Sequence, residues 1–411
     1  MSQIVNVDVA VVGGGPSGLA SAIALRREGV TDVLVLEREP EAGGVPRHCA
    51  HPPYGIREFG RLMTGPTYAA RVRERAIAAG VDVRVRHSVV ALEPGGRLQV
   101  ATPEGALTVQ ARRVILATGA REAPRSARRV TGDRPLGVVN TGALQAYIYL
   151  KHLKPFRRPV MVGTELVSLS AIWTCLRHGI RPVAIVEEDR RGKARWPLTL
   201  FPRLCGIPVY YGWRIGDMRG TGRVEEVELV DGSGRTKRLA CDGVLFTGQF
   251  VPEASLMRMG PIVVDRNSGG PSVDQDGRCS DPDYYAAGNL LRPIENAGWC
   301  YQEGLRAGRA VAEDLAWSNT GRTMPAAVPI LCGEAVKLVV PQRIARSSAQ
   351  QALNSLQVRL SEPRSGALTI RADDKVIWSR RIRSRPERRI LVPLTALLAG
   401  EQPSHYTVSV D

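Results

Sequence analysis

The stretch VDVAVVGGGPSG, residues 7–18, decides the fold of this 411-residue chain. A run of β-branched residues precedes three glycines, and the helix-favouring segment 19–27 follows them, so the stretch predicts a strand, a tight turn and a helix. Glycines in such a turn let the backbone approach a pyrophosphate, and the helix N-terminus offers free N–H groups to the phosphates. The stretch therefore predicts a dinucleotide site in a Rossmann-like fold.

Three segments farther along the chain support this prediction. The apolar strand 33–36 ends at Glu37, where a carboxylate can accept hydrogen bonds from the hydroxyl groups of a ribose. Segment 114–119 predicts a buried strand that ends in small residues, suited to lying against a cofactor. Segment 283–289 repeats this design before a helix expected from Glu295. The chain is therefore expected to leave its first domain and return to it.

A second strand, helix and strand are predicted at 159–162, 169–178 and 182–188. In the turn between the first two, Glu165 stands at the second glycine position and Ser168 at the third. A carboxylate about 5 Å from a phosphate charge costs on the order of 3 kcal/mol at an effective dielectric near 20. NAD(P) binding is therefore doubtful here, and we expect a structural relic. The alternative, that Glu165 points away and a cofactor still binds, stays open.

The formal charge of +16 is compatible with nucleic acid, an anionic membrane surface or an acidic protein as partner. No recognised nucleic-acid motif occurs, so we expect no nucleic-acid partner. Peripheral membrane contact stays open. The segment 379–389 concentrates the positive charge, and the preferred interpretation of that patch is an acidic protein partner.

The seven cysteines are scattered without a C-x-x-C pair or a ligand cluster. We therefore expect no metal, no iron–sulfur cluster and no redox-active disulfide bound by this chain alone. Buried thiols of this kind are typical of a reducing compartment. Because residues 7–12 already predict a strand, no leader segment is expected ahead of them, and we expect a cytoplasmic protein.

These segments resemble the two-dinucleotide-binding-domain flavoproteins over about residues 5–318. In that family the first motif binds FAD, and a late glycine-aspartate step places a carboxylate on the ribityl chain of the flavin. Here the late step is Gly288-Asn289, so one charge is missing but hydrogen bonding is retained. The resemblance implies FAD contacts from Gly13, Gly15, Pro16, Ser17, Gly18, Glu37, Arg38, Gly44, Val45, Arg47, His48, Val90, Ala117, Thr118, Gly119, Gly288, Asn289, Gly298 and Trp299.

Four separated blocks narrow the resemblance to one branch of these flavoproteins. They are residues 46–52 (PRHCAHP), 162–171 (VGTELVSLSA), 245–253 (LFTGQFVPE) and 288–300 (GNLLRPIENAGWC). They resemble the FAD subunits of opine oxidase, hydrogen cyanide synthase and hydroxyproline dehydrogenase, in which another flavoprotein oxidises the substrate.

The resemblance implies an FAD-dependent oxidoreductase that is the electron-transfer subunit of a multi-component dehydrogenase. The substrate would be an amino acid, opine, amine or polyol-type compound. The implied partners are a substrate-oxidising flavoprotein subunit, together with an iron–sulfur or small cysteine-rich subunit. Two alternatives stay open, namely a free-standing NAD(P)H-dependent flavin oxidoreductase and a non-catalytic, FAD-bearing assembly subunit.

The densest group of reactive side chains is Arg47, His48 and Cys49, which are the candidate catalytic residues. Arg47 or His48 could stabilise the anionic edge of a reduced flavin, and Cys49 could stand near its ring. The alternative is a loop that packs around FAD without any role in proton transfer. The resemblance also places Glu295 and Trp299 over the flavin, next to a helix N-terminus that favours the anionic form.

After residue 321 short runs of strand-forming residues predict a small all-β domain, with a hairpin turn at Ala372–Lys375. The FAD subunits named above carry a cysteine-rich module here instead, so any iron–sulfur centre would belong to another chain. Overall we expect an α/β fold with two Rossmann-like dinucleotide-binding domains and a C-terminal all-β domain. The expected division is 1–125 and 256–320 for the FAD-binding domain, 126–255 for the second Rossmann-like domain and 325–411 for the β domain.

Overall fold

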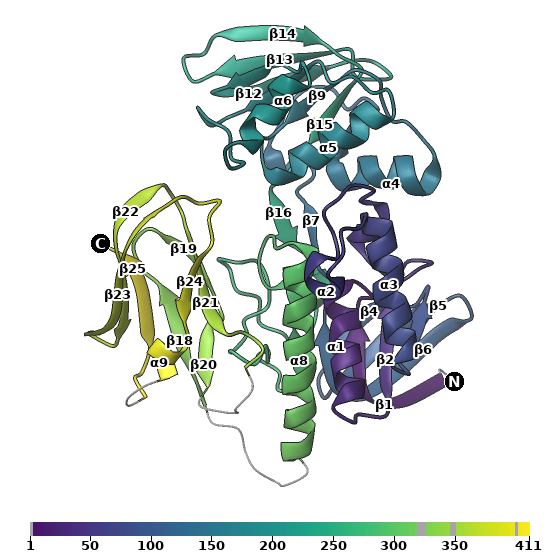
Figure 1. Cartoon of the computed structure of the whole chain (residues 1–411), viewed down its shortest axis with the longest axis vertical. Coiled ribbons are helices and arrows are strands. Elements are labelled where there is room, and N and C mark those ends of the chain that lie inside the picture. Colours follow the sequence, from purple (N-terminus) through teal and green to yellow (C-terminus); the bar gives the residue numbers. More distant parts are fainter. Residues whose placement is uncertain (1–2, 319–325, 346–350, 399–401) are drawn as a thin grey trace.

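The computed structural model describes residues 3–318, 326–345, 351–398 and 402–411, which form three lobes (Figure 1). The predicted boundary between 320 and 325 lies outside the described residues. The lobes confirm the expected α/β fold with two Rossmann-like sheets and further β structure.

The first lobe is built on a seven-stranded sheet in the order β3-β2-β1-β6-β5-β4, with β17 also paired to β6. Strands β1, β2, β3, β6 and β17 run parallel, and β4 and β5 form an antiparallel extension. The strands are β1 (Gln3–Val12), β2 (Val33–Glu37), β3 (Asp82–Val85), β4 (Ser88–Glu93), β5 (Arg97–Thr102), β6 (Gly105–Leu116) and β17 (Tyr284–Ala286). Because β17 comes late in the chain, it confirms that the chain returns to this sheet.

Helices α1, α3 and α8 pack on one face of this sheet, where their apolar side chains form one core with Val9, Val35 and Ile115. Two glycines of α8 allow it to touch α1, since a Cβ on Gly304 would lie 2.1 Å from the Ser17 carbonyl oxygen. A Cβ on Gly308 would lie 2.3 Å from the carbonyl oxygen of Ser21. The helical segments of this lobe are α1 (Pro16–Arg27), η1 (Val45–His48), α2 (Ile56–Phe59), α3 (Gly65–Ala78), α7 (Ser255–Arg258), η4 (Gly288–Leu290) and α8 (Ala297–Ser318).

The second lobe has three layers around a parallel sheet in the order β11-β10-β9-β15-β8. Helices α4, α5 and α6 share a core on one face, and the antiparallel sheet β12-β13-β14 covers the other. The strands are β8 (Val138–Asn140), β9 (Pro159–Val162), β10 (Ala184–Glu187), β11 (Val209–Tyr211), β12 (Trp213–Arg219), β13 (Glu226–Asp231), β14 (Thr236–Ala240) and β15 (Gly243–Phe246). The helical segments are η2 (Arg125–Arg128), α4 (Thr141–Lys151), α5 (Leu166–Arg177), η3 (Leu198–Leu200) and α6 (Phe201–Leu204).

Two short antiparallel strands, β7 (Ala120–Glu122) and β16 (Phe250–Pro252), connect the first two lobes (Figure 1). Glu122 ties this connection to the second lobe, because its carboxylate accepts hydrogen bonds from the backbone N–H groups of Gly142 and Gly248 at 2.9 and 3.0 Å.

The C-terminal lobe consists of two facing sheets, β20-β18-β25-β22-β23 and β19-β21-β24, with an apolar core between them. It lies beside α8 (Figure 1). Ala372 pairs with Lys375 at the end of the β22–β23 hairpin, which confirms the predicted turn. Its elements are β18 (Ala327–Cys332), β19 (Val336–Val340), β20 (Arg343–Ala345), β21 (Ser355–Leu360), β22 (Arg364–Ala372), β23 (Lys375–Ser384), β24 (Ile390–Pro393), α9 (Thr395–Leu398) and β25 (Tyr406–Val410).

Two predicted element starts differ from the structure. The helix expected from Glu295 begins at Ala297, because the Glu295 backbone N–H donates a hydrogen bond to Asn289 Oδ1 and closes a loop instead. The helix expected from residue 169 begins already at Leu166, directly after Glu165. In the described parts of the chain, no helix is both long enough and apolar enough to cross a membrane.

Candidate functional site

The turn after β1 requires glycine at two positions and leaves space at a third. Gly13 has φ 108°, and a Cβ on it would lie 2.5 Å from the Ala117 carbonyl oxygen. A Cβ on Gly18 would lie 1.9 Å from the carbonyl oxygen of Gly13. At Gly15 a Cβ would meet only the Gly44 Cα, at 3.9 Å. The first two glycines thus pack the fold, whereas Gly15 leaves the start of α1 accessible to a ligand.

The start of α1 offers hydrogen-bond donors to an anion. The Ser17 hydroxyl is buried, and among the described residues it has no hydrogen-bond partner. Pro16 occupies the first turn of this twelve-residue helix, whose N-terminal N–H groups are free of intrahelical acceptors. The positive end of the helix dipole also favours negative charge here. This donor set fits the pyrophosphate of a dinucleotide.

Glu37 lies buried at the end of β2 and is held by two backbone groups. Its Oε2 accepts a hydrogen bond from the Gly14 N–H at 2.9 Å, and its Oε1 accepts one from the Glu39 N–H at 2.8 Å. Each carboxylate oxygen keeps a further lone pair, which is the acceptor that a ribose diol requires. The neighbouring Arg38 is exposed and pairs with Glu39 at 3.7 Å.

Other predicted cofactor residues fall around the same turn. A Cβ on Gly44 would lie 2.8 Å from the Cα of Gly15, and a Cβ on Gly119 would meet nothing within 4 Å. The Thr118 hydroxyl donates to the Glu253 carbonyl oxygen at 2.8 Å, so it already has an acceptor in the protein. Val45 and Val90 have exposed side chains, and Ala117 is buried.

The segment η1 brings Arg47 and His48 next to this turn. Burial, and then the positive charge of Arg47, lower the pKa of His48 to about 4. His48 is therefore a neutral imidazole at neutral pH. Arg47 donates a hydrogen bond to the Glu41 carbonyl oxygen at 2.8 Å, while its buried Nε has no hydrogen-bond partner among the described residues. Arg47 is thus the permanent cation of this segment.

Cys49 is a buried, protonated thiol that connects the first two lobes. Burial raises its pKa to about 11. Its Sγ donates to Oε1 of Gln145 in α4 at 3.3 Å. A protonated thiol is a weak hydrogen-bond donor. It is also a poor nucleophile at neutral pH, because the thiolate is the nucleophilic form. The catalytic assignments of Arg47, His48 and Cys49 stay predictions.

The returning segment is a closed loop between η4 and α8. The side-chain amide of Asn289 bonds the backbone of Glu295 in both directions: Oδ1 accepts from its N–H at 2.6 Å, and Nδ2 donates to its carbonyl oxygen at 3.0 Å. Gly288, with φ 77°, lies against Ser17, and a Cβ there would be 2.8 Å from the Ser17 Cβ. The Asn289 side chain therefore serves loop closure, and Gly288 borders the phosphate-binding turn.

Two guanidinium groups lie over the ring of Trp299. The Cζ atoms of Arg57 and Arg389 lie 4.2 and 5.1 Å from the centre of its ring. Gly298 packs against α2, where a Cβ would lie 2.8 Å from Oε1 of Glu58. Gly298 and Trp299, two of the predicted cofactor contacts, are thus held in place by α2 and by Arg389 of the C-terminal lobe.

The sequence did not reveal the charged residues that hold the returning segment. Arg292 and Glu303 form a buried ion pair, and Arg292 also donates to the Gly288 carbonyl oxygen at 3.0 Å and to Gln357 of the C-terminal lobe at 2.9 Å. Glu295 pairs with Arg389 at 2.9 Å and with Arg359 at 3.7 Å. No local motif predicts these pairs, because the partners come from distant parts of the chain.

The second turn repeats the backbone of the first. Gly163 has φ 110°, and the Thr164 N–H donates to Glu187 Oε2 at 3.1 Å. This contact spans 23 residues, as does the one between Gly14 and Glu37. The Asp189 N–H donates to the other Glu187 oxygen at 3.0 Å, as the Glu39 N–H does to Glu37. The Rossmann geometry of the second lobe is therefore intact.

The Glu165 side chain folds across this second turn. A Cβ on Gly163 would lie 2.5 Å from Glu165 Oε2, and a Cβ on Gly248 would lie 2.5 Å from Glu165 Cδ. The Thr247 hydroxyl is 3.4 Å from Oε2. Burial raises the pKa of Glu165, and the charge of Lys193 opposes that rise. The carboxylate thus lies over the strand ends. Ser168 donates to the Glu165 carbonyl oxygen at 2.6 Å, inside the first turn of α5.

Lys193 forms an ion pair with Glu187, the carboxylate that corresponds to Glu37 in the first lobe. Its Nζ lies 3.0 Å from Glu187 Oε1 and 3.7 Å from both Glu165 Oε1 and Asp189 Oδ2. Its own backbone N–H donates to the Thr164 hydroxyl at 3.0 Å, which fixes the loop that carries it. Burial lowers the pKa of Lys193, but Glu165 and Glu187 outweigh it and raise the pKa overall. Two charged side chains of the chain itself thus lie at the second turn.

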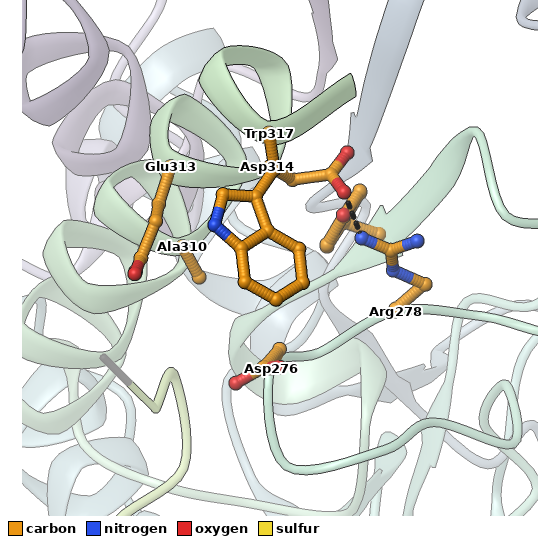
Figure 2. Close-up of a pocket in the computed structure, with 7 residues that line it drawn as sticks. Asp276, Arg278, Ala310, Glu313, Asp314 and Trp317 are labelled. Carbon is orange, nitrogen blue, oxygen red and sulfur yellow. Dashed lines mark hydrogen bonds and ion pairs between the residues drawn. The ribbon is translucent and has the colours of Figure 1, made fainter. Parts of the chain in front are cut away.

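A cavity of about 20 Å³ lies at the C-terminal half of α8 (Figure 2). The Tyr285 hydroxyl, Arg278 Nε and Glu313 Oε2 are buried there without hydrogen-bond partners among the described residues. Figure 2 shows the Arg278 guanidinium bonded to Asp314, beside the Trp317 ring. A space of this size suits one ordered water and is far too small for a dinucleotide.

The chain is similar in sequence to subunits of several bacterial enzymes. It is 30% identical over 265 residues to the alpha chain of the sarcosine oxidase of Rhizobium meliloti, covering 60% of this chain and 24% of that one. It is 30% identical over 243 residues to the HcnB subunit of the hydrogen cyanide synthase of Pseudomonas aeruginosa, covering 54% and 51%. One subunit of the opine oxidase of Rhizobium meliloti is 26% identical over 186 residues, covering 45% and 39%. The chain thus spans between about a quarter and a half of these relatives.

Solved structures share its fold. The thioredoxin reductase of T. acidophilum superposes with a TM-score of 0.64 at 22% identity, covering 75% of this chain and 98% of that one. The L-proline dehydrogenase of P. horikoshii gives a TM-score of 0.56 at 19% identity, covering 77% and 57%. At these identities the likeness shows the fold alone.

The model of one protein family, the pyridine nucleotide-disulphide oxidoreductases, matches residues 7–304, most of the first two lobes. This family binds FAD, in agreement with the donor set around Gly15, Ser17 and Glu37. The chain therefore belongs to the pyridine nucleotide-disulphide oxidoreductase family and is an FAD-dependent oxidoreductase.

Proposed function

We propose that this chain is the electron-transfer flavoprotein subunit of a multi-component dehydrogenase. In this proposal a partner flavoprotein oxidises an amino acid, opine, amine or polyol-type substrate and passes the electrons to this chain. The sequence relatives named above are subunits of sarcosine oxidase, hydrogen cyanide synthase and opine oxidase, and this supports the proposal.

The observation that carries the proposal is the state of the second nucleotide site. Glu165 lies where a pyrophosphate would approach Gly163, and Lys193 pairs with Glu187, the counterpart of Glu37. A nicotinamide dinucleotide would have to displace both side chains, and its phosphates would meet a carboxylate. Electrons are therefore proposed to come from another protein and not from NAD(P)H.

FAD, when bound, supplies an electron carrier that exchanges electrons in pairs or singly. The residues of this chain are proposed to hold it at three points. The N–H groups at the start of α1 and the Ser17 hydroxyl would bind the pyrophosphate, and Glu37 would accept the ribose hydroxyls. Arg47 is proposed as the cation that stabilises negative charge on the flavin, since His48 is neutral at neutral pH.

The onward path is proposed to lead to an iron–sulfur or small cysteine-rich subunit. All seven cysteines of this chain are free thiols. Within the described ranges no group of three His, Cys, Asp or Glu side chains is arranged to hold a metal ion. The proposal therefore assigns the iron–sulfur centre to a separate chain.

A second candidate function is an NAD(P)H-dependent flavin oxidoreductase. The intact backbone geometry of the second turn, with Gly163 and Glu187 in place, favours it. This candidate needs Glu165 and Lys193 to move away when the nucleotide binds. It predicts rapid flavin reduction by NADH or NADPH, which the first proposal does not.

The proposal is tested by purifying the tagged chain from its native cells and quantifying flavin and iron. We expect a second flavin-bearing chain and protein-bound iron at fixed ratios to the tagged chain. Recovery of the tagged chain alone, with one flavin and no iron, would contradict the proposal. A different result would be a complex in which no electrons pass between the partners and this chain, in either direction, even after reduction by dithionite. That result would identify an assembly subunit.

A further inference from the structure

The helical layer of the second lobe leaves a large apolar surface exposed. Inward-facing residues of α5, such as Ala171 and Ile172, pack in the core against the parallel sheet. On the outer side, α5 exposes Leu166, Trp173 and Leu176. Figure 1 shows α5 and α6 on the outside of this lobe.

The segment after β10 extends this surface. The Ala194 N–H donates to the Thr164 carbonyl oxygen at 3.0 Å, which places the segment beside the start of α5. The side chains of Trp196 and Leu204 are 80% and 82% exposed, more than almost any other large apolar residue of the chain. We call the surface formed by Leu166, Trp173, Leu176, Trp196, Leu198, Leu200 and Leu204 the α5–α6 face.

Exposed arginines lie in the same segments that carry the α5–α6 face. Between residues 141 and 204 the chain has eleven lysine or arginine residues and only four acidic ones, three of which pair with Lys193. Five arginines of α5, of the segment after β10 and of α6 are exposed, and none of them forms an ion pair within the described ranges: Arg177, Arg190, Arg191, Arg195 and Arg203.

We propose that the α5–α6 face is the docking surface for an acidic protein partner, whose carboxylates meet these exposed arginines. The inference rests on the proposed function for the existence of a partner subunit. Exposed aromatic and leucine side chains with an arginine rim are typical of protein interfaces, in which lysine is depleted. The planar guanidinium group binds carboxylates with two parallel hydrogen bonds.

The charge of the face decides between this partner and a second copy of the chain. In a symmetric dimer through the α5–α6 face, Arg195 and Arg203 would meet arginines of the other copy. Like charges brought together in an interface repel and weaken association. An acidic partner instead gains from the same charges.

One arginine of the basic segment predicted to bind an acidic partner feels the charge of the segment after β10. Arg388 lies within electrostatic reach of Arg195 and Arg191, and together with burial their charges lower its pKa. Basic side chains of the second lobe and of the C-terminal lobe therefore act on one another electrostatically.

The test uses the complex purified through the tagged chain. Two variants are compared, the double substitution Trp196→Glu with Leu204→Glu and the control Leu136→Glu with Met259→Glu. The control side chains are 72% and 75% exposed but lie outside the α5–α6 face. We expect the first pair to weaken binding of the partner flavoprotein at least about tenfold, and the control to leave it unchanged. Replacing Arg195 and Arg203 by serine should slow association and reduce its dependence on salt.

Each other outcome overturns the inference. If the complex forms equally well with both double variants, the partner docks elsewhere, while the proposed function stands. If the chain comes from its cells without any partner, both proposals fail. If Trp196→Glu with Leu204→Glu dissociates a homodimer without affecting a protein partner, the face binds a second copy of the chain. If it abolishes sedimentation with vesicles of phosphatidylcholine and phosphatidylglycerol without affecting a protein partner, the face binds a membrane.

Discussion

The Nζ of Lys193 lies 3.0 Å from Oε1 of Glu187, at the end of β10 in the second lobe. The equivalent carboxylate in the first lobe is Glu37, and each accepts a hydrogen bond from a backbone N–H 23 residues earlier. The two sites therefore share their backbone design. The second differs because a cation and the Glu165 side chain of the same chain already fill it.

Replacing Lys193 should expose the electrostatic strain in the second site. Lys193→Gln leaves Glu165 and Glu187 close together without their common cation, so the free energy of unfolding should fall by roughly 1 to 3 kcal/mol. Thermal and urea unfolding measure the loss. Lys193→Gln combined with Glu165→Gln should recover part of it, because the repulsion is removed. Exposed Lys337 provides the control substitution, and an equal loss in Lys337→Gln would contradict this account.

Substitutions of Gly15 and Gly18 by alanine should have different effects, the first on FAD binding and the second on folding. Gly15→Ala adds a methyl group that meets only Gly44 at 3.9 Å, so the apoprotein should keep its melting temperature but lose most of its bound FAD. Gly18→Ala places a methyl group 1.9 Å from the Gly13 carbonyl oxygen, so it should destabilise the apoprotein itself. The flavin-to-protein absorbance ratio and apoprotein melting temperature report the two effects. Full FAD content in Gly15→Ala would place the pyrophosphate elsewhere.

The stability of the protein should depend on His48 below neutral pH. The folded-state pKa of about 4 lies below the ordinary value of 6.5, so the unfolded chain binds this proton more tightly. The contribution is fully present above pH 6.5 and is lost as the pH falls from 6.5 through about 4. The unfolding free energy should fall by roughly 1 to 3 kcal/mol over this window.

Urea unfolding of FAD-loaded and FAD-free protein at several pH values checks this. His48→Gln should flatten the dependence. The control is His152→Asn at an exposed residue with φ 55°, a conformation that asparagine tolerates. If His48→Gln leaves the pH profile unaltered, the imidazole is already charged in the folded state.

Arg389 should influence FAD binding from the C-terminal lobe. It lies 2.9 Å from Glu295 and stacks on Trp299, so Arg389→Met loosens the loop closed by Asn289. We expect FAD to bind about tenfold more weakly, which corresponds to about 1.4 kcal/mol. The fluorescence of released flavin measures this. Arg389→Lys should restore part of the affinity, and Arg381→Met on the exposed face of β23 should have no effect. Equal affinity in Arg389→Met and wild type would contradict a role for this lobe.

Features set by neighbouring residues could be predicted from the sequence. The turn at Gly13–Gly18, the carboxylate of Glu37 and the hairpin at Ala372–Lys375 depend on local backbone geometry, which glycine spacing and strand patterns encode. The anomaly at Glu165 was visible for the same reason. The direction of the Glu165 side chain could not be predicted, because its contacts with Gly248 and Lys193 exist only in the folded chain.

Features set by distant residues could not be predicted. The contact between Cys49 and Gln145 depends on how the first two lobes meet. The start of α8 shifted to Ala297 because the Asn289 amide binds the backbone of Glu295, and a helical pattern alone does not show such a competitor. The role of Arg389 needs the C-terminal lobe in place.

The source of the electrons is tested most directly by anaerobic stopped-flow spectroscopy of the FAD-loaded wild-type chain. Mixed with NADH or NADPH, the flavin should stay oxidised over seconds at millimolar nucleotide, because a nicotinamide dinucleotide would have to displace Glu165 and Lys193. Mixed with its substrate-reduced partner flavoprotein, the flavin should bleach. Rapid bleaching by micromolar NADH or NADPH would show that the second site opens and that this chain is a nicotinamide-dependent reductase.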